Sequence, residues 1–161
     1  MPDSAPHTAS APQAARTVLA FDFGKRRIGL AIGDTLTRTA APRPAVAVHA
    51  SGPDWTAISR EVRDAHADVL LVGLPLQADG SPGMLTPAAR EFAAQLRERF
   101  ALPVEHVDEW GSSLEASATL AASRARGERP RRVRKGEVDS AAAAVILERW
   151  LAGERTLTYA G

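Results

Sequence analysis

Three acidic residues stand where secondary-structure elements of this chain are expected to begin or end. Asp22 lies near the end of the apolar run Thr17 to Phe23, Glu109 follows the run Leu102 to Val107, and Asp139 opens an alanine-rich segment. Carboxylate oxygen is the ligand that Mg²⁺ prefers in proteins. Two such ions, held by a few carboxylates, can promote hydrolysis of a phosphodiester. If folding brings the three residues together, the sequence predicts a metal site for phosphoryl chemistry.

Each carboxylate also has a structural explanation, which the sequence leaves open. Asp22 could be a turn aspartate before Gly24, although a charge within a buried strand is costly unless it is paired or binds a cation. Glu109 could be solvent-exposed beside a helix-capping Asp108, and Asp139 could be the N-cap of the last helix. Only the joint occurrence of the three favours a metal site.

Five strands are expected from the apolar patterning. Thr17 to Phe23 and Arg27 to Asp34 are separated by a short turn, so they should pair as a hairpin. The other expected strands are Pro44 to His49, Asp68 to Gly73 and Leu102 to Val107.

Four helices are expected between and after these strands. The first is Asp54 to His66, with Trp55, Ile58 and Val62 on one face. The second begins at Thr86-Pro87, with Thr86 as its cap and Phe92, Leu96 and Phe100 on its buried face, and the last two are Ser112 to Ser123 and Val138 to Leu151. A hairpin followed by β-α-β units predicts an α/β fold in which a mixed five-stranded sheet is flanked by helices.

Basic residues are concentrated in one segment, although the net charge of the chain is only +1. Arg124 to Lys135 carries seven arginines and lysines against one glutamate, and Gly127 and Pro130 make it a loop rather than a helix. Such a run is often no more than a solvated loop. Next to an acidic site, a phosphate-binding role gains weight.

The composition indicates one globular domain. The chain has 161 residues, 45% hydrophobic and 24% charged, and we expect a domain over 17–151 between a disordered tail at 1–16 and a short tail at 152–161. Cysteine is absent, which fits a reducing compartment. No apolar run is long enough to span a membrane, and the first residues do not form a secretory signal.

Four strings in collinear order resemble the YqgF/RuvX family of pre-16S rRNA nucleases and Holliday-junction-resolvase-like proteins. They are LAFDFGKRRIGLAIGD (19–34), LLVGLPLQADGSPG (70–83), VDEWGSS (107–113) and KGEVDSAAAAVILERWL (135–151). The resemblance implies an RNase H-like fold, and it implies divalent-metal phosphodiester hydrolysis with Mg²⁺ or Mn²⁺. It also implies a part in 5′-end maturation of 16S rRNA in the bacterial cytoplasm.

The same resemblance assigns roles to particular residues. Catalytic and metal-binding positions carry over to Asp22, Glu109 and Asp139. A loop beside the site corresponds to Gly73-Leu74-Pro75, and the family's hydroxyl positions to Ser112 and Ser113. One position departs from the family pattern: Trp110 stands where an arginine is usual, so a guanidinium that could bind carboxylate or phosphate is replaced by a ring that packs or stacks on a base.

The expected function is therefore a metal-dependent nuclease acting on precursor rRNA or another structured nucleic acid, with pre-ribosomal particles as an expected partner. The candidate phosphate-binding residues are Lys25, Arg26, Arg27, Arg131, Arg132, Arg134 and Lys135. We expect a cytoplasmic protein without membrane contact, as a monomer or weak dimer. Two alternatives remain: a junction resolvase acting on branched DNA, and a non-catalytic nucleic-acid-binding regulator on the same scaffold.

Overall fold

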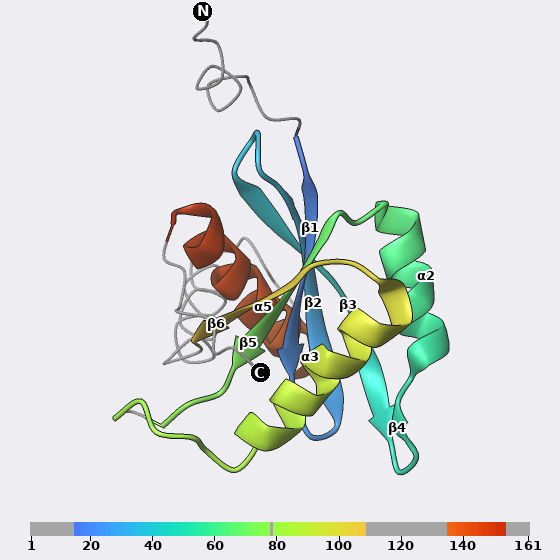
Figure 1. The fold of residues 1–161 in the computed structure, drawn as a ribbon, viewed down its shortest axis with the longest axis vertical. Helices are drawn as coiled ribbons and strands as arrows, with labels where there is room; N and C mark the ends of the chain where they lie inside the picture. The colour runs from blue at the N-terminus through green and yellow to red at the C-terminus, as the bar shows by residue number, and fades with distance from the viewer. Residues whose placement is uncertain (1–14, 78, 109–134, 154–161) are drawn as a thin grey trace, which may run out of the picture.

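The two apolar runs nearest the N-terminus form the predicted hairpin at the centre of one mixed sheet. The computed structural model describes residues 15–77, 79–108 and 135–153. Its sheet has six strands in the order β4-β3-β2-β1-β5-β6 (Figure 1). The strands are β1 (Thr17–Phe23), β2 (Arg27–Asp34), β3 (Thr39–His49), β4 (Gly52–Pro53), β5 (Val69–Leu74) and β6 (Val104–Asp108). The described helices are α2 (Trp55–Ala65), α3 (Thr86–Phe100) and α5 (Lys135–Leu151).

Strand direction divides the sheet into two halves. β1 pairs antiparallel with β2, with Thr17 opposite Asp34 and Phe23 opposite Ile28. β5 runs parallel to β1, and β6 runs parallel to β5. The carboxyl ends of β1, β5 and β6 therefore lie at the same edge of the sheet, which we call the carboxyl edge. In open α/β sheets this is the edge where ligands usually bind.

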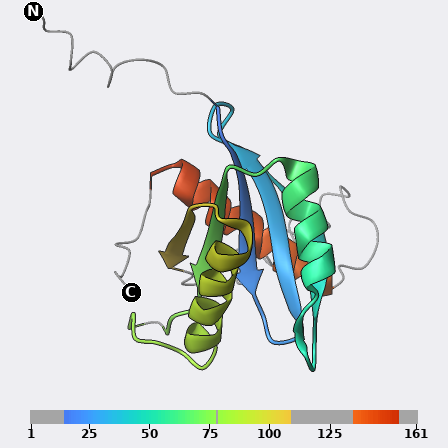
Figure 2. The same ribbon diagram turned by 45° about the vertical axis from the view of Figure 1, so that its right-hand side comes forward.

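Helices cover both faces of the sheet, with α2 and α3 on one face and α5 on the other (Figures 1 and 2). Alternation along β1 gives each face its core, because successive side chains point to opposite sides. Leu19 and Phe21 pack with Ile58 of α2 and Phe92 of α3. On the other face, the core contains Val18, Ala20 and Ala31 of the sheet and Ala143, Ile146, Leu147 and Trp150 of α5.

The prediction of five strands is wrong by one. The additional strand is β4, which pairs with the end of β3. Pro53 belongs to β4, and Asp54, the predicted first residue of the helix, is the N-cap of α2, where its carboxylate accepts a hydrogen bond from Ala57 N. β3 also begins at Thr39 rather than at Pro44. β4 pairs only with Val48 and His49, so the part of β3 that contains Pro42 and Pro44 has no neighbouring strand on that side. Prolines are tolerated at such an edge because no backbone N–H is needed there.

Two helix boundaries differ from the predictions in ways that matter for the candidate site. Thr86 does not cap α3, because the N-cap position is Leu85 and has no side-chain cap bond. α5 begins at Lys135 instead of Val138, so Asp139 lies inside the helix and is not its N-cap. Its carboxylate is therefore not used in capping.

Other predictions fall outside the described residues: the tails, the helix at 112–123 and most of the basic run. Lys135, the last residue of that run, is the first residue of α5. Within the described ranges, no helix is long and apolar enough to cross a membrane.

Candidate active site at the carboxyl edge

Asp22 is a buried carboxylate at the carboxyl edge, with 7% of its surface exposed. It shares the α5 face of β1 with Val18 and Ala20, since the three positions alternate with Leu19 and Phe21. Its neighbours across the sheet are both glycines, Gly29 on β2 and Gly73 on β5. The sequence therefore leaves both flanks of this carboxylate without a side chain.

Gly29 is also the place where α5 meets the sheet. A Cβ built at Gly29 would lie 2.0 Å from the carbonyl oxygen of Asp139 and 2.7 Å from Ser140 N. Only glycine lets the helix backbone approach this closely. Because Asp22 lies directly opposite Gly29, the fold brings Asp22 and the Asp139 backbone to the same point of the sheet.

A hydrogen bond fixes α5 at this position. Ser140 is 2% exposed, and its hydroxyl accepts from Leu30 N at 3.3 Å. The β2–β3 ladder shifts register between Ile28 and Leu30, so the hydroxyl bonds to β2 where the ladder is irregular. Ser140 and Gly29 were not among the predicted site residues, although a glycine inside a strand is a recognised sign of close backbone approach.

The Asp139 carboxylate forms an ion pair with Arg27, the first residue of β2. Arg27 Nε donates to Asp139 Oδ2 at 2.9 Å, and the two side chains are 36% and 30% exposed. One carboxylate oxygen is used in this contact, and one guanidinium nitrogen. Of the predicted phosphate-binding residues whose side chains the structure describes, Lys25, Arg26 and Arg27, it is thus Arg27 that pairs with a carboxylate of the candidate site.

β6 leads toward the third predicted ligand. Its residues Val107 and Asp108 lie level with Gly73 and Leu74 of β5, so the strand ends at the same edge as Asp22. Glu109 follows directly but lies outside the described residues, as do Trp110, Ser112 and Ser113. Within the described ranges, no three His, Cys, Asp or Glu side chains form a cluster able to hold a metal ion.

The donors that are described nevertheless fit a hard divalent cation. Asp22 and Asp139 offer only carboxylate oxygens, the ligands of Mg²⁺ and Mn²⁺. A buried carboxylate such as Asp22 needs compensation by a positive charge or hydrogen bonds. A zinc or iron–sulfur centre of thiolates is excluded by the absence of cysteine.

The remaining described basic candidates lie in the turn between β1 and β2. Lys25 and Arg26 are exposed there, next to the end of β1. Arg131, Arg132 and Arg134 lie outside the described residues, and Lys135 is described only as the start of α5. The phosphate-binding role of these residues stays a prediction.

The loop after β5 is held in a defined shape beside Gly73 and Pro75. Thr86, which is fully buried, accepts a hydrogen bond from Gly83 N at 2.7 Å and donates one to the Pro75 carbonyl. A bridge between Leu76 and Pro82 closes the loop further out. Thr86, which was expected to cap α3, therefore joins Pro75 and Gly83, which lie at the two ends of the loop that follows β5.

His106 lies on the α3 side of β6 and is a further titratable group of this strand. Both ring nitrogens are buried, and within the described part of the chain neither has a hydrogen-bond partner. Burial lowers the pKa of the imidazole, and the positive charges of Arg97 and Arg90 lower it further. Both effects disfavour the protonated imidazolium.

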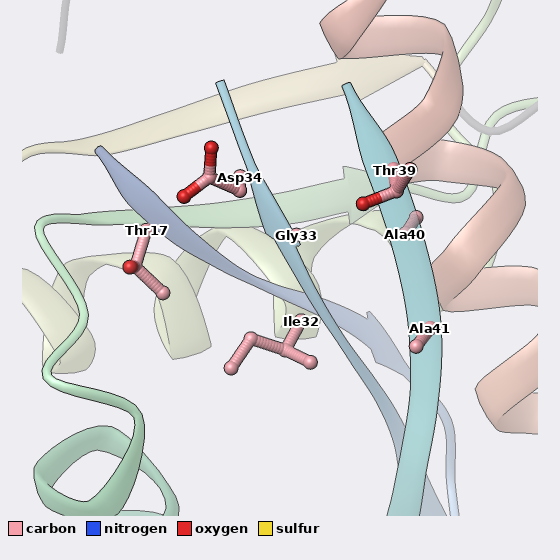
Figure 3. A pocket seen from close by; sticks show the side chains of 7 residues that line it. All are labelled: Thr17, Ile32, Gly33, Asp34, Thr39, Ala40 and Ala41. Carbon is pink, nitrogen blue, oxygen red and sulfur yellow. The ribbon is translucent and has the colours of Figure 1, made fainter. Parts of the chain in front are cut away.

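A pocket of about 310 Å³ lies at the opposite end of the hairpin, among the side chains shown in Figure 3. Its lining includes Thr17 at the start of β1 and Asp34 at the end of β2. Asp22 is five residues further along β1, roughly 17 Å away at the rise of an extended strand. This pocket is not part of the candidate site.

Comparison with known proteins points to nucleic-acid cleavage. The RuvX family model, described as Holliday junction resolvase, matches residues 16–153. A "Putative pre-16S rRNA nuclease" of Xanthomonas oryzae pv. oryzae (strain PXO99A) is 48% identical over 136 residues, covering 84% of this chain and 87% of the relative. A protein of the same name from Xanthomonas campestris pv. campestris (strain B100) is 45% identical over 142 residues, covering 88% and 91%.

Solved structures with the same architecture include two resolvases bound to junction DNA. The Fowlpox virus resolvase complex has a TM-score of 0.55 at 10% identity, covering 85% of this chain and 97% of the other. The Thermus thermophilus RuvC complex has a TM-score of 0.50 at 14% identity, covering 87% and 98%. At these identities the likeness shows the fold alone, and it confirms the predicted RNase H-like architecture.

Proposed function

The chain belongs to the RuvX family, and from this premise we propose that it is a divalent-metal-dependent nuclease that helps to mature the 5′ end of 16S rRNA. The observation that carries the proposal is the buried Asp22 at the carboxyl edge. It lies opposite Gly29, which is in close contact with the backbone of Asp139. Core packing does not explain a carboxylate at this buried position. Names of the relatives at 45–48% identity support the choice of substrate.

In this proposal Asp22 and Asp139 are ligands of Mg²⁺ or Mn²⁺, and Glu109 completes the set. The ions supply charge neutralisation of the scissile phosphate and activation of the attacking water. The protein holds its carboxylates in position: Asp22 through the β1 ladder, and Asp139 through the close contact of α5 with Gly29 and the Ser140–Leu30 hydrogen bond. Rigid placement of ligands on strands and helices is what such a reaction requires.

The substrate backbone would be held by cations around this edge. Lys25 and Arg26 are exposed in the β1–β2 turn, within reach of a strand that enters the site. Arg131, Arg132, Arg134 and Lys135 would extend the basic surface. Such contacts are with phosphates, so they confer affinity rather than sequence preference. Gly73, Pro75, Ser112 and Ser113 would contact substrate at the site.

Precursor rRNA, free or in pre-ribosomal particles, is the proposed partner, and the cytoplasm is the proposed location. A second candidate is cleavage of four-way DNA junctions, which is favoured by the description of the family model. It would use the same carboxylates, but would require a dimer to cut two strands symmetrically.

The decisive experiment compares cleavage of a precursor 16S rRNA fragment and of a four-way DNA junction, each with Mg²⁺ or Mn²⁺. We expect the wild type to cut the RNA, and Asp22→Asn to lose at least about a hundredfold in rate with the fold retained. Asp64→Asn, the same change at an exposed position of α2, is the matched control and should cleave normally. Full metal-dependent cleavage by Asp22→Asn would overturn the assignment, and preference for the junction would favour the second candidate.

A further inference from the structure

The ion pair between Arg27 and Asp139 uses only part of each side chain. Arg27 Nε contacts Asp139 Oδ2 at 2.9 Å. Among the contacts of the described residues, this is the one polar interaction of either side chain. The terminal nitrogens of Arg27 and the second oxygen of Asp139 therefore remain available to a ligand.

The backbones on both sides of this pair are fixed, so the pair itself is a consequence of the fold. Arg27 begins β2 after a turn so tight that a Cβ at Gly24 would lie 2.5 Å from the Arg27 carbonyl oxygen. Asp139 is held by the contact of α5 with Gly29 and by the Ser140 hydroxyl. The neighbouring Arg26 is exposed.

A guanidinium in this place opposes the binding of a metal ion. It occupies an oxygen of a proposed ligand, and its positive charge repels a second cation at short range. The pair is nevertheless easy to break, because both side chains are about one-third exposed. A guanidinium also binds phosphate in a bidentate manner, so a nucleic-acid backbone offers Arg27 a better partner.

We propose that Arg27 is a positioning residue that neutralises Asp139 in the substrate-free protein and moves to a substrate phosphate when nucleic acid binds. This inference rests on the proposed function, because it takes Asp139 as a metal ligand. Its consequence is that the divalent cation and the nucleic acid bind together: the substrate withdraws the cationic side chain, and Asp139 becomes free for the ion. A protein without substrate then holds metal weakly.

The first test measures Mn²⁺ affinity of the full chain without nucleic acid, from the free-ion signal in electron paramagnetic resonance. We expect Arg27→Gln to bind Mn²⁺ about tenfold more tightly than the wild type, because the competing charge is gone. Arg27→Lys, which keeps the charge, should remain close to the wild type. Arg60→Gln removes the same charge at an exposed position of α2, away from the carboxyl edge, and should also leave the affinity unchanged. Melting curves establish that each variant is folded.

The second test adds a phosphorothioate RNA oligonucleotide of the precursor sequence. We expect the RNA to tighten Mn²⁺ binding to the wild type about tenfold and to have less than about a twofold effect on Arg27→Gln. A merely structural role of Arg27 would lower metal affinity in Arg27→Gln, and this result would overturn the inference. An equal effect of RNA on both proteins would also overturn it.

Failure of this inference is distinguishable from failure of the proposed function. If the wild type cleaves RNA and binds Mn²⁺ while Arg27→Gln shows no gain in affinity, only the role of Arg27 is refuted. If neither protein binds Mn²⁺ with or without RNA, the metal site and the role of Arg27 are both refuted.

Discussion

Gly29 of β2 and Asp139 of α5 are in backbone contact, so close that a single methyl group on Gly29 would overlap the Asp139 carbonyl oxygen, 2.0 Å away. Because Gly29 is also the cross-strand partner of Asp22, the same contact sets the relation between the two carboxylates. Gly29 therefore determines both how closely α5 packs on the sheet and how the two carboxylates of the candidate site lie relative to each other.

Replacing Gly29 with alanine is expected to displace the start of α5. Overpacking of this kind costs about 1–3 kcal/mol of unfolding free energy, and loss of the carboxylate geometry should reduce cleavage further. Urea unfolding and the cleavage rate are the measurements. Gly136→Ala is the control in the same helix, because its Cβ would meet Ala45 Cβ at an ordinary 3.5 Å. A Gly29→Ala protein with normal stability and activity would show that the contact can relax.

Divalent cations should stabilise the folded protein through Asp22. A ligand that binds only the native state at a hundredfold excess over its Kd adds about 2.7 kcal/mol. Thermal melting with and without Mn²⁺ measures this effect, which EDTA should remove. We expect Asp22→Asn to lose the stabilisation and Asp64→Asn, on the exposed side of α2, to keep it. An undiminished shift in Asp22→Asn would place the ion elsewhere.

Thr86 should be essential to the loop after β5. Thr86→Val keeps the shape but removes the hydroxyl that bonds to Pro75 and Gly83, leaving buried polar groups unsatisfied at about 1–3 kcal/mol. Hydrogen exchange in 75–85 should increase, and the KM for RNA should rise if the loop contacts substrate. Thr86→Ser restores the hydroxyl and should recover most of the wild-type behaviour. If the valine variant exchanges no faster, other contacts hold the loop.

Acid should destabilise the protein partly through His106. The pKa of this buried imidazole is lowered in the native state, first by burial and then by Arg97 and Arg90. As the pH falls below about 6.5, the unfolded chain takes up a proton that the native chain resists, so the free energy of unfolding decreases. His106→Leu should make stability less dependent on pH between 7 and 5. Chemical unfolding across this range measures the slope, and an identical slope in the variant would refute the role of His106.

The sequence predicted the bounds of both strands of the central hairpin, β1 and β2, correctly. Two runs of apolar residues separated by a short turn allow few other ways for the strands to pair. It also predicted the buried faces of α2 and α3, including Ile58, Val62, Phe92 and Leu96, from helical spacing. β4 was missed because two residues carry no periodic pattern, and β3 was shortened because its prolines argue against a strand unless it lies at an edge.

The sequence could place two of the candidate acidic residues, Asp22 and Asp139, on a strand and a helix, but it could not give their contacts. Asp22 could be assigned to the α5 face from alternation alone, yet its pairing with two glycines depends on which strands lie beside β1. The partnership of Arg27 with Asp139 joins positions 112 residues apart. Local spacing contains no information about such a contact, so the sequence could offer Arg27 only as one basic residue among several.

That separation has a consequence for the order in which the protein becomes active. β1 and its aspartate are synthesised before α5, because they precede it in the chain. A nascent chain that has folded its sheet still lacks one of the proposed metal ligands, because domains form their long-range contacts only when the distant segment is present. Asp22 and Asp139 would thus come together only after α5 has been synthesised, so the proposed pair of metal ligands would form later than the sheet that carries the first of them.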